Sequence, residues 1–246
     1  MVPPDNASPE RIDLNADLGE GVTDDEGLLA VVTSANVACG YHAGDVATMT
    51  SVCELAAERG VALGAQVSYD DREGFGRRDL DVAPTLLRDQ VAAQVAVLDD
   101  IAHQAGAAVT YVKAHGALYH RVARDPEQAR ALLDGTGSLP VLGLPGTVLL
   151  ELAAAHGRRT WREGFPDRRY EGERTGAGLG HGGLVPRGEP DSVLHDPHEV
   201  AARAVELARS GTVDSVCVHG DNPGAVATAR AVRALLEATG FDVRPL

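Results

Sequence analysis

The sequence contains little cysteine, little basic charge and no long apolar run. Its three cysteines, Cys39, Cys53 and Cys217, include no C-x-x-C pair, and an odd number of cysteines argues against a disulfide framework. No apolar stretch approaches the ~20 residues that a membrane-spanning helix needs. The first residues also lack the basic and apolar segments of a secretory signal. We therefore expect a soluble protein of the reducing cytoplasm.

Basic residues are outnumbered by acidic ones. The chain has 22 lysines and arginines against 36 aspartates and glutamates, which gives a formal net charge of −14. Such a charge repels polyanions and argues against nucleic acid or an anionic membrane as a partner. An anionic substrate would therefore need a local cluster of basic residues.

Several motifs of common enzymes are missing as well. There is no G-x-x-x-x-G-K-[ST] phosphate loop, no G-x-G-x-x-G fingerprint after a predicted strand, no H-E-x-x-H zinc motif and no G-x-S-x-G nucleophile elbow. We do not expect the chain to bind ATP by itself.

What the sequence does contain is a regular alternation of two patterns. Seven short apolar runs, most of them followed by a stretch with helical periodicity, are candidate strands. They are centred near Ile12, Asn36, Leu63, Val112, Leu142, Trp161 and Val216. Strands that alternate with helices pair in parallel through right-handed crossovers, and ~250 residues is a typical length for an α/β barrel. We predict one α/β barrel domain over residues 1–246, with a doubly wound open sheet as the alternative.

Four helices can be bounded from the sequence. The clearest runs from Pro84 to about Gln104, because proline suits a first turn and apolar residues then recur every three or four positions. Another follows Asp45, a candidate N-cap, and ends near Gly60. The last two span residues 197–210 and 224–240.

Two polar, glycine-rich stretches interrupt the alternation. Residues 68–78 and residues 163–188 are too long for simple connectors, and long loops in compact domains are often functional. We expect both to fold over the mouth of the barrel.

Polar side chains alternate with apolar ones along the first predicted strand. Asp13, Asn15 and Asp17 therefore share one side of it. Either they form a hydrogen-bonded polar layer, or they bind a metal, act as a base or orient a substrate. Asp17, which is nearest the end of the strand, is the best candidate for chemistry.

His42, and the pair Lys113 and His115, lie at the ends of two further strands, where ligands of α/β proteins bind. A histidine there can serve as acid, base or metal ligand, and a lysine can neutralise a carboxylate or a phosphate. An ordinary buried histidine is the alternative for His115, whereas Asp45 is best explained as a helix cap. We expect one shared mouth lined by Asp, Asn, Lys and His.

Arg77 and Arg78, together with residues 167–169, supply positive charge in an acidic chain. Neighbouring arginines suit bidentate capture of an anionic substrate, although surface ion pairs with Asp71, Glu73 or Asp167 are the commoner fate of such residues. The histidines on expected helices and loops are given no role. These are His103, His120, His156, His181, His195 and His198.

Six segments taken together closely resemble the LamB/YcsF family of bacterial 5-oxoprolinase A subunits. They are residues 13–21, 34–45, 74–78, 113–119, 167–170 and 218–223, in the order of the family. The resemblance implies a distorted (β/α)7-type barrel related to sugar deacetylases. It also implies ATP-dependent opening of 5-oxoproline to glutamate, in which the partner subunits B and C use ATP to activate the lactam.

The chain departs from the family pattern at three places. Gln66 stands where many members have histidine, so a neutral amide replaces a candidate metal ligand. We therefore expect no tightly bound metal. Ala114 replaces a usual proline, which alters backbone stiffness more than chemistry, and the stretch 172–188 is unusually rich in glycine.

The leading hypothesis is a hydrolase that opens a cyclic amide after partner subunits have activated it. Asp17 or His115 would activate water, and His42 would assist proton transfer or polarise the ring carbon. Lys113 would hold a carboxylate or phosphate. The expected substrate-binding residues are Asn15, Gln66, Arg77, Arg78, His219 and Asp221.

Two alternatives stay open. The first is a metal-dependent amidase or deacetylase that works without ATP, with Asp17, His42 and His115 as ligands. The second is a non-catalytic subunit that binds a small acid and carries it to a partner.

Overall fold

Seven parallel strands close on themselves in the computed structural model, which describes residues 10–22, 24–220 and 224–246. The strands are β1 (Arg11–Leu18), β2 (Ser34–Ala38), β3 (Ala62–Val67), β4 (Val109–Ala114), β5 (Val141–Gly143), β6 (Thr160–Gly164) and β7 (Ser215–Val218). Each strand pairs with the next along the chain, and β1 pairs with both β2 and β7. That double pairing closes the barrel, so the predicted barrel is confirmed and the open-sheet alternative is wrong. A short strand, β8 (Asp242–Val243), adds to the beginning of β1.

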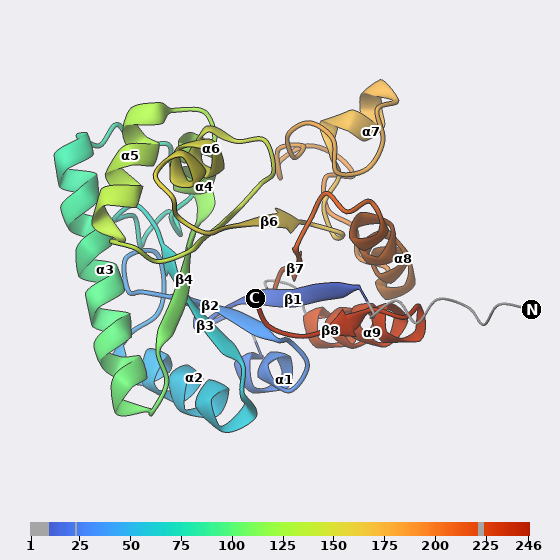
Figure 1. The fold of residues 1–246 in the computed structure, drawn as a ribbon, viewed down its shortest axis with the longest axis horizontal. Coiled ribbons are helices and arrows are strands. Elements are labelled where there is room, and N and C mark those ends of the chain that lie inside the picture. Colours follow the sequence, from blue (N-terminus) through green and yellow to red (C-terminus); the bar gives the residue numbers. More distant parts are fainter. Residues whose placement is uncertain (1–9, 23, 221–223) are drawn as a thin grey trace, which may run out of the picture.

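Helices follow most of the strands and surround the barrel (Figure 1). In the described part of the chain they are α1 (Asp25–Leu29), α2 (Val46–Arg59), α3 (Pro84–Gln104), α4 (Gly116–Val122), α5 (Pro126–Gly135), α6 (Val148–Ala155), α7 (Glu171–Thr175), α8 (Pro197–Arg209) and α9 (Ala225–Ala238). The four helices bounded from the sequence, α2, α3, α8 and α9, are confirmed within two residues at each end. The others are too short for an apolar period to be recognised.

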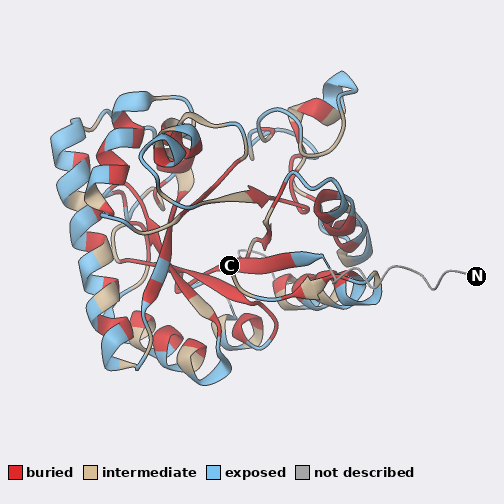
Figure 2. Cartoon of the chain, in the orientation of Figure 1, coloured by how far each residue is buried: buried red, intermediate tan, exposed pale blue. Residues whose placement is uncertain are grey.

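The apolar core lies between the strands and the inner faces of the helices (Figure 2). In α3, Leu87, Val91 and Leu98 recur at helical spacing and are fully buried. Full burial of one such side chain contributes about 1.5–3 kcal/mol, so this apolar face fixes the helix on the sheet. α2 begins after Asp45, whose carboxylate accepts from the backbone N–H of Thr48, which confirms the predicted N-cap.

The inside of the barrel is polar, unlike its outside. Asn36 Nδ2 donates to Asn15 Oδ1 at 2.7 Å and to Asp17 Oδ1 at 2.9 Å, and Asn36 Oδ1 accepts from the hydroxyl of Tyr111. The ring of Tyr111 fits because Gly64 has no side chain; a Cβ there would lie 2.2 Å from it. Asn15 thus belongs to a hydrogen-bonded polar layer, which is the first of the two alternatives that the sequence left open for the polar side of this strand.

Two long loops lie at the carboxyl ends of the strands, one after β3 and one after β6. The first reaches the start of α4, where Gly76 O accepts from the backbone N–H of Ala117. The second contains α7 and is held against α8 by Arg203, which donates to Glu173 and to the backbone oxygen of Pro166. Among the described residues, no helix combines the length and the apolar character needed to cross a membrane.

Candidate active site

A cavity of about 70 Å³ opens at the carboxyl ends of β1, β4 and β7. Its walls come from these strand ends, from α4 and from both long loops. The lining residues are Asp17, Glu20, Arg77, Lys113, Ala114, His115, Gly116, Tyr119, His120, Phe165, Arg168, Leu184, Arg187, His219 and Gly220. The carboxyl ends of the strands carry the ligand site in α/β barrels, so this cavity is the candidate active site.

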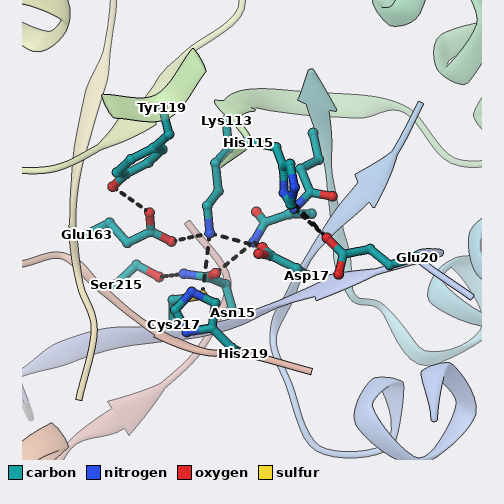
Figure 3. A network of polar contacts seen from close by, with 12 residues as sticks. Asn15, Asp17, Glu20, Lys113, His115, Tyr119, Glu163, Ser215, Cys217 and His219 are labelled. Atoms are coloured by element: carbon teal, nitrogen blue, oxygen red, sulfur yellow. Dashed lines mark hydrogen bonds and ion pairs between the residues drawn. The ribbon is translucent and has the colours of Figure 1, made fainter. Parts of the chain in front are cut away.

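Lys113 is the only lysine of the chain, and it is buried in the wall of the cavity. Its Nζ donates to Glu163 Oε1 at 2.7 Å and to Asp17 Oδ1 at 3.0 Å, and lies 3.4 Å from Cys217 Sγ (Figure 3). Glu163 also accepts from the hydroxyl of Tyr119 at 3.0 Å. One ammonium is thus shared by two buried carboxylates, one from β1 and one from β6.

The charges of this network determine its protonation states. Burial by itself lowers the pKa of Lys113, but Asp17 and its other neighbours outweigh burial and hold that pKa well above its ordinary value. Burial raises the pKa of Asp17, but Lys113 and then His219 outweigh it, so that pKa lies well below its ordinary value. Burial and then the Glu163 charge raise the pKa of Tyr119 well above 10. At neutral pH the network therefore contains an ammonium, an ionised Asp17 and a neutral phenol.

Two histidines stack at the same end of the barrel. The rings of His42 and His115, which follow β2 and β4, lie nearly parallel with 3.9 Å between their centres. The side-chain amide of Gln66 connects them: its Oε1 lies 3.2 Å from His42 Nε2, and its Nε2 lies 3.0 Å from His115 Nδ1. The same Nε2 donates to Glu20 Oε1 at 3.1 Å. We call these four buried residues the amide-linked cluster.

The Gln66 amide assigns the protons of this cluster. Because its NH₂ group donates to His115 Nδ1, the proton of His115 is on Nε2, which donates to the backbone oxygen of Phe75 at 3.0 Å. Burial and then the neighbouring His42 lower the pKa of His115 well below 6.5, so this ring is neutral. His42 Nε2 lies 3.2 Å from Gln66 Oε1, and His42 Nδ1 is buried without a hydrogen-bond partner in the described part of the chain.

The loop after β3 covers the stacked rings. Phe75 has a left-handed backbone conformation, with φ of 55°, which is uncommon for a residue with a side chain. Its ring meets His42 and His115 edge-on, with 5.8 and 5.5 Å between ring centres. Gly76 follows at φ of 67°, and a Cβ there would lie 2.9 Å from the Cβ of His42. Only glycine lets the loop approach the histidines this closely.

Glu20, His42 and His115 are a group that could hold a metal ion, because one ligand atom from each lies within 4.8 Å of the others. Two imidazoles and a carboxylate suit zinc. Glu20, rather than the Asp17 named from the sequence, is the carboxylate of this group. The amide of Gln66 contacts all three ligand atoms, however, and an amide is a poor ligand for a transition metal. A metal would have to displace that amide, so the residues present fit the hydrogen-bonded arrangement better than a metal centre.

A further histidine, His219, is paired with a carboxylate. Its Nδ1 lies 2.9 Å from Asp167 Oδ2, and its backbone N–H donates to the same oxygen. Its ring stacks on Phe165, with 5.2 Å between ring centres. Burial by itself raises the pKa of Asp167, but the contacts with His219 outweigh burial and lower it, so the carboxylate is ionised. An ionised partner at Nδ1 keeps the proton on that nitrogen, which makes Nε2 the nitrogen that can accept another.

The structure brings most of the sequence-predicted residues to this end of the barrel. Those that line the cavity are Asp17, Arg77, Lys113, His115 and His219. Asn15, His42 and Gln66 are buried next to the cavity and do not line it. Arg78 does not line it either. Asp221 lies outside the described residues.

The position of Arg78 has a simple electrostatic reason. Its guanidinium lies 3.5 Å from Asp71 and 3.5 Å from Glu73, and more than half of its side chain is exposed. The alternative interpretation, a surface ion pair, therefore describes Arg78, whereas Arg77 turns toward the cavity.

The sequence-based prediction gives no catalytic or substrate-binding role to several residues of the site. They are Glu20, His120, Glu163 and Asp167. Glu20 and Asp167 lie within two of the six family-like segments, which was a usable signal. Glu163 and His120 had none, because an acidic residue near a strand end and a histidine on a helix are common without any function.

Known proteins resemble this chain over almost its whole length. The model of the LamB/YcsF family matches residues 12–246. A protein of Streptomyces avermitilis that is named as the A subunit of 5-oxoprolinase is 55% identical over an alignment that covers 94% of this chain and 98% of that protein. The crystal structure of a lactam utilization protein from Thermus thermophilus has a TM-score of 0.87 and 36% identity, and the match covers 96% of this chain and 100% of that one.

A more distant similarity concerns the fold alone. The T48 deacetylase has a TM-score of 0.55 and 14% identity, with 98% of this chain and 90% of that one covered. It shares the barrel fold with this chain. The family match and the identity to the Streptomyces protein are much stronger, and they show that this chain is a member of the LamB/YcsF family.

Proposed function

We propose that this protein is the ring-opening subunit of an ATP-dependent 5-oxoprolinase, which hydrolyses 5-oxo-L-proline to L-glutamate. The observation that carries the proposal is the cavity at the strand ends, where a histidine–carboxylate pair and a buried ammonium meet. The similarity to a 5-oxoprolinase A subunit and to a lactam utilization protein supports a lactam as the substrate. The reaction belongs in the cytoplasm, where ATP is available and the buried thiols stay reduced.

A five-membered lactam is a resonance-stabilised amide and resists attack by water. The partner subunits B and C activate it by transferring a phosphoryl group from ATP to the lactam oxygen, which suits a chain without a phosphate loop. Water then adds to the ring carbon, the C–N bond breaks and the nitrogen takes a proton. A second water releases phosphate from the carboxyl phosphate and leaves glutamate.

His219 acts as the general base in this scheme. Asp167 holds Nδ1 and stabilises the imidazolium that forms when Nε2 takes a proton from water. His115 is less suited to the role than the sequence suggests, because both of its ring nitrogens are engaged and its pKa is lowered. The low pKa of Asp17 makes that carboxylate a weak base as well.

Lys113 stabilises negative charge on the substrate. Its ammonium is held in one position by Asp17 and Glu163, so it needs no reorganisation to neutralise the negative charge of the phosphoryl group on the lactam oxygen. Arg77 binds the carboxylate of the substrate at the rim. The amide-linked cluster supports His115 and shapes the wall, and the scheme requires no metal ion.

A metal-dependent amidase is the second candidate, because Glu20, His42 and His115 form a group of suitable ligands. Such an enzyme would open the lactam without ATP. The two functions therefore differ in whether glutamate release requires ATP, which can be measured directly.

The test is glutamate release from 5-oxoproline by the chain alone, by subunits B and C alone, and by the three together, each with and without ATP. We expect release only from the complete complex with ATP. Robust release by the isolated chain without ATP would refute the proposal and favour the amidase. Unchanged activity of the complex after Lys113→Met and His219→Asn would favour a non-catalytic binding subunit.

A further inference from the structure

A second pocket, which we call the arginine pocket, adjoins the candidate active site. Its volume is about 410 Å³, and Arg77, Arg124, Arg168 and Arg187 line it together with His120. All of these except Arg124 also line the first cavity, so the two spaces share a wall.

The four arginines come from separate parts of the chain. Arg77 belongs to the loop after β3, Arg124 follows α4, and Arg168 and Arg187 belong to the loop after β6. Arg168 is only 4% exposed, and its guanidinium donates to two backbone oxygens of its own loop. The pocket is therefore assembled by the fold from both loops that the sequence singled out.

The charge of the arginine pocket is opposite to that of the whole protein. The net charge of the chain is −14, yet no carboxylate is among the described residues that line the pocket. The positive charge affects His120, because desolvation of its ring, and then the charges of Arg168, Arg124 and Arg187, lower its pKa. The pocket thus concentrates positive potential next to the active site.

Another surface pocket also contains arginines, but acidic residues accompany them. It lies between α3 and α5 and contains Arg88 and Arg130, which are accompanied by Glu127 and Asp134. Its lining is therefore balanced in charge, and it provides a control within the same chain.

The number of guanidinium groups indicates the class of anion. One bidentate arginine neutralises a single carboxylate, which is all that 5-oxoproline carries. A phosphoryl group has a charge of about −1.5 to −2 at neutral pH and three strong acceptor oxygens, so it can engage several guanidinium groups at once. We propose that the arginine pocket binds the phosphoryl group of a phosphorylated small molecule whose remainder reaches the candidate active site. The inference rests on the proposed function only in naming that molecule as the activated lactam.

Titration calorimetry of the full chain with inorganic phosphate, at one low ionic strength, tests the proposal. Arg124→Gln and Arg187→Gln each remove one lining guanidinium, and Arg130→Gln is the matched control from the charge-balanced pocket. We expect each pocket variant to weaken phosphate binding about tenfold, as the loss of one charge-assisted hydrogen bond implies, and the control to match the wild type. Acetate, the carboxylate probe, should bind at least about tenfold more weakly than phosphate.

Three results would overturn the proposal: no phosphate binding by the wild type, equal affinity in the wild type and both pocket variants, or acetate binding as tight as phosphate binding. Thermal unfolding of each variant checks that it is folded. If the variants keep their phosphate affinity but lose subunits B and C, the pocket is a protein-docking surface instead. Phosphate binding needs neither ATP nor partners, so a chain that binds phosphate yet supports no ring opening refutes the proposed function alone.

Discussion

The ammonium of Lys113 lies 2.7 Å from Oε1 of Glu163, and this contact joins two strands, β4 and β6, that are not neighbours in the sheet. It exists only because the barrel is closed and both side chains point inward. Asp17 shares the same ammonium. Removing the lysine would leave two buried carboxylates without their cation, which is the arrangement in which buried charges destabilise a fold most.

We expect Lys113→Met to lower the free energy of unfolding by about 3–5 kcal/mol at pH 7. Lys113 is the largest of the causes that lower the pKa of Asp17, so without it we expect burial to outweigh His219 and His115 and to raise that pKa above its ordinary value of 3.8. The folded variant then binds protons more tightly than the unfolded chain. Its stability then falls as the pH rises, and the deficit is smaller at pH 5 than at pH 7. In the wild type, stability depends on pH in the opposite direction. The depressed pKa of Asp17 stabilises the folded protein at pH values above the ordinary pKa of this residue, and that stabilisation is lost as the pH falls toward the depressed pKa.

Urea unfolding of Lys113→Met at pH 5 and pH 7 measures the loss of stability and its dependence on pH, and unfolding of the wild type below pH 3.8 measures the opposite trend. Glu163→Gln is the matched variant, because it keeps Lys113 paired with Asp17 and should be the less destabilised of the two. An equal loss of stability at the two pH values in Lys113→Met would contradict the argument.

His219→Asn and Asp167→Asn should each reduce kcat for glutamate release by the complete complex about 10²–10⁴-fold, with little change in KM, because each removes part of the general base. His103→Asn, an exposed histidine of α3, is the control and should leave kcat unchanged. Steady-state kinetics with saturating ATP provide the measurement. If both site variants kept wild-type kcat, the base would have to be sought elsewhere.

Arg77 and Arg78 provide a test with adjacent residues of identical chemistry. Arg77 lines the cavity, whereas Arg78 pairs with Asp71 and Glu73 on the surface. Arg77→Gln should raise KM for 5-oxoproline about tenfold, as the loss of a charge-assisted hydrogen bond implies, and Arg78→Gln should leave KM within experimental error. Equal effects of the two variants would show that the orientation of Arg77 does not determine substrate binding.

Gln66→His should raise the affinity for zinc, because a third imidazole would replace the amide among Glu20, His42 and His115. We expect the wild-type protein to purify without a stoichiometric transition metal and the complex to keep its activity after chelation, once magnesium for ATP is restored. Elemental analysis and activity assays check both statements. The metal-free scheme would be wrong if the wild-type protein contained near-stoichiometric zinc and if zinc, but not magnesium, restored its activity after chelation.

The sequence predicts those features that depend on near neighbours in the chain. Alternation of polar and apolar residues identifies β1, and Pro84 with a regular apolar spacing bounds α3. The same local patterns place Lys113 and His115 at the end of a strand, and parallel strands bring their carboxyl ends to one face. The spacing of apolar residues, helix caps and turns at glycine are local signals, which is why the barrel and the location of its mouth could be predicted.

Only the tertiary structure determines which side chains meet at that mouth. Lys113 and Asp17 are 96 residues apart, and His219 and Asp167 are 52 residues apart, so neither pair leaves a pattern in the sequence. Their contacts depend on strand register and on closure of β1 against β7, which involve the whole chain. Burial then decides their charges, because the pKa of a side chain depends on the dielectric and the neighbours that the completed fold provides. The sequence therefore predicts which residues lie at the strand ends. Which of them serve as the base, the cation and the partner carboxylates is determined only when the barrel closes.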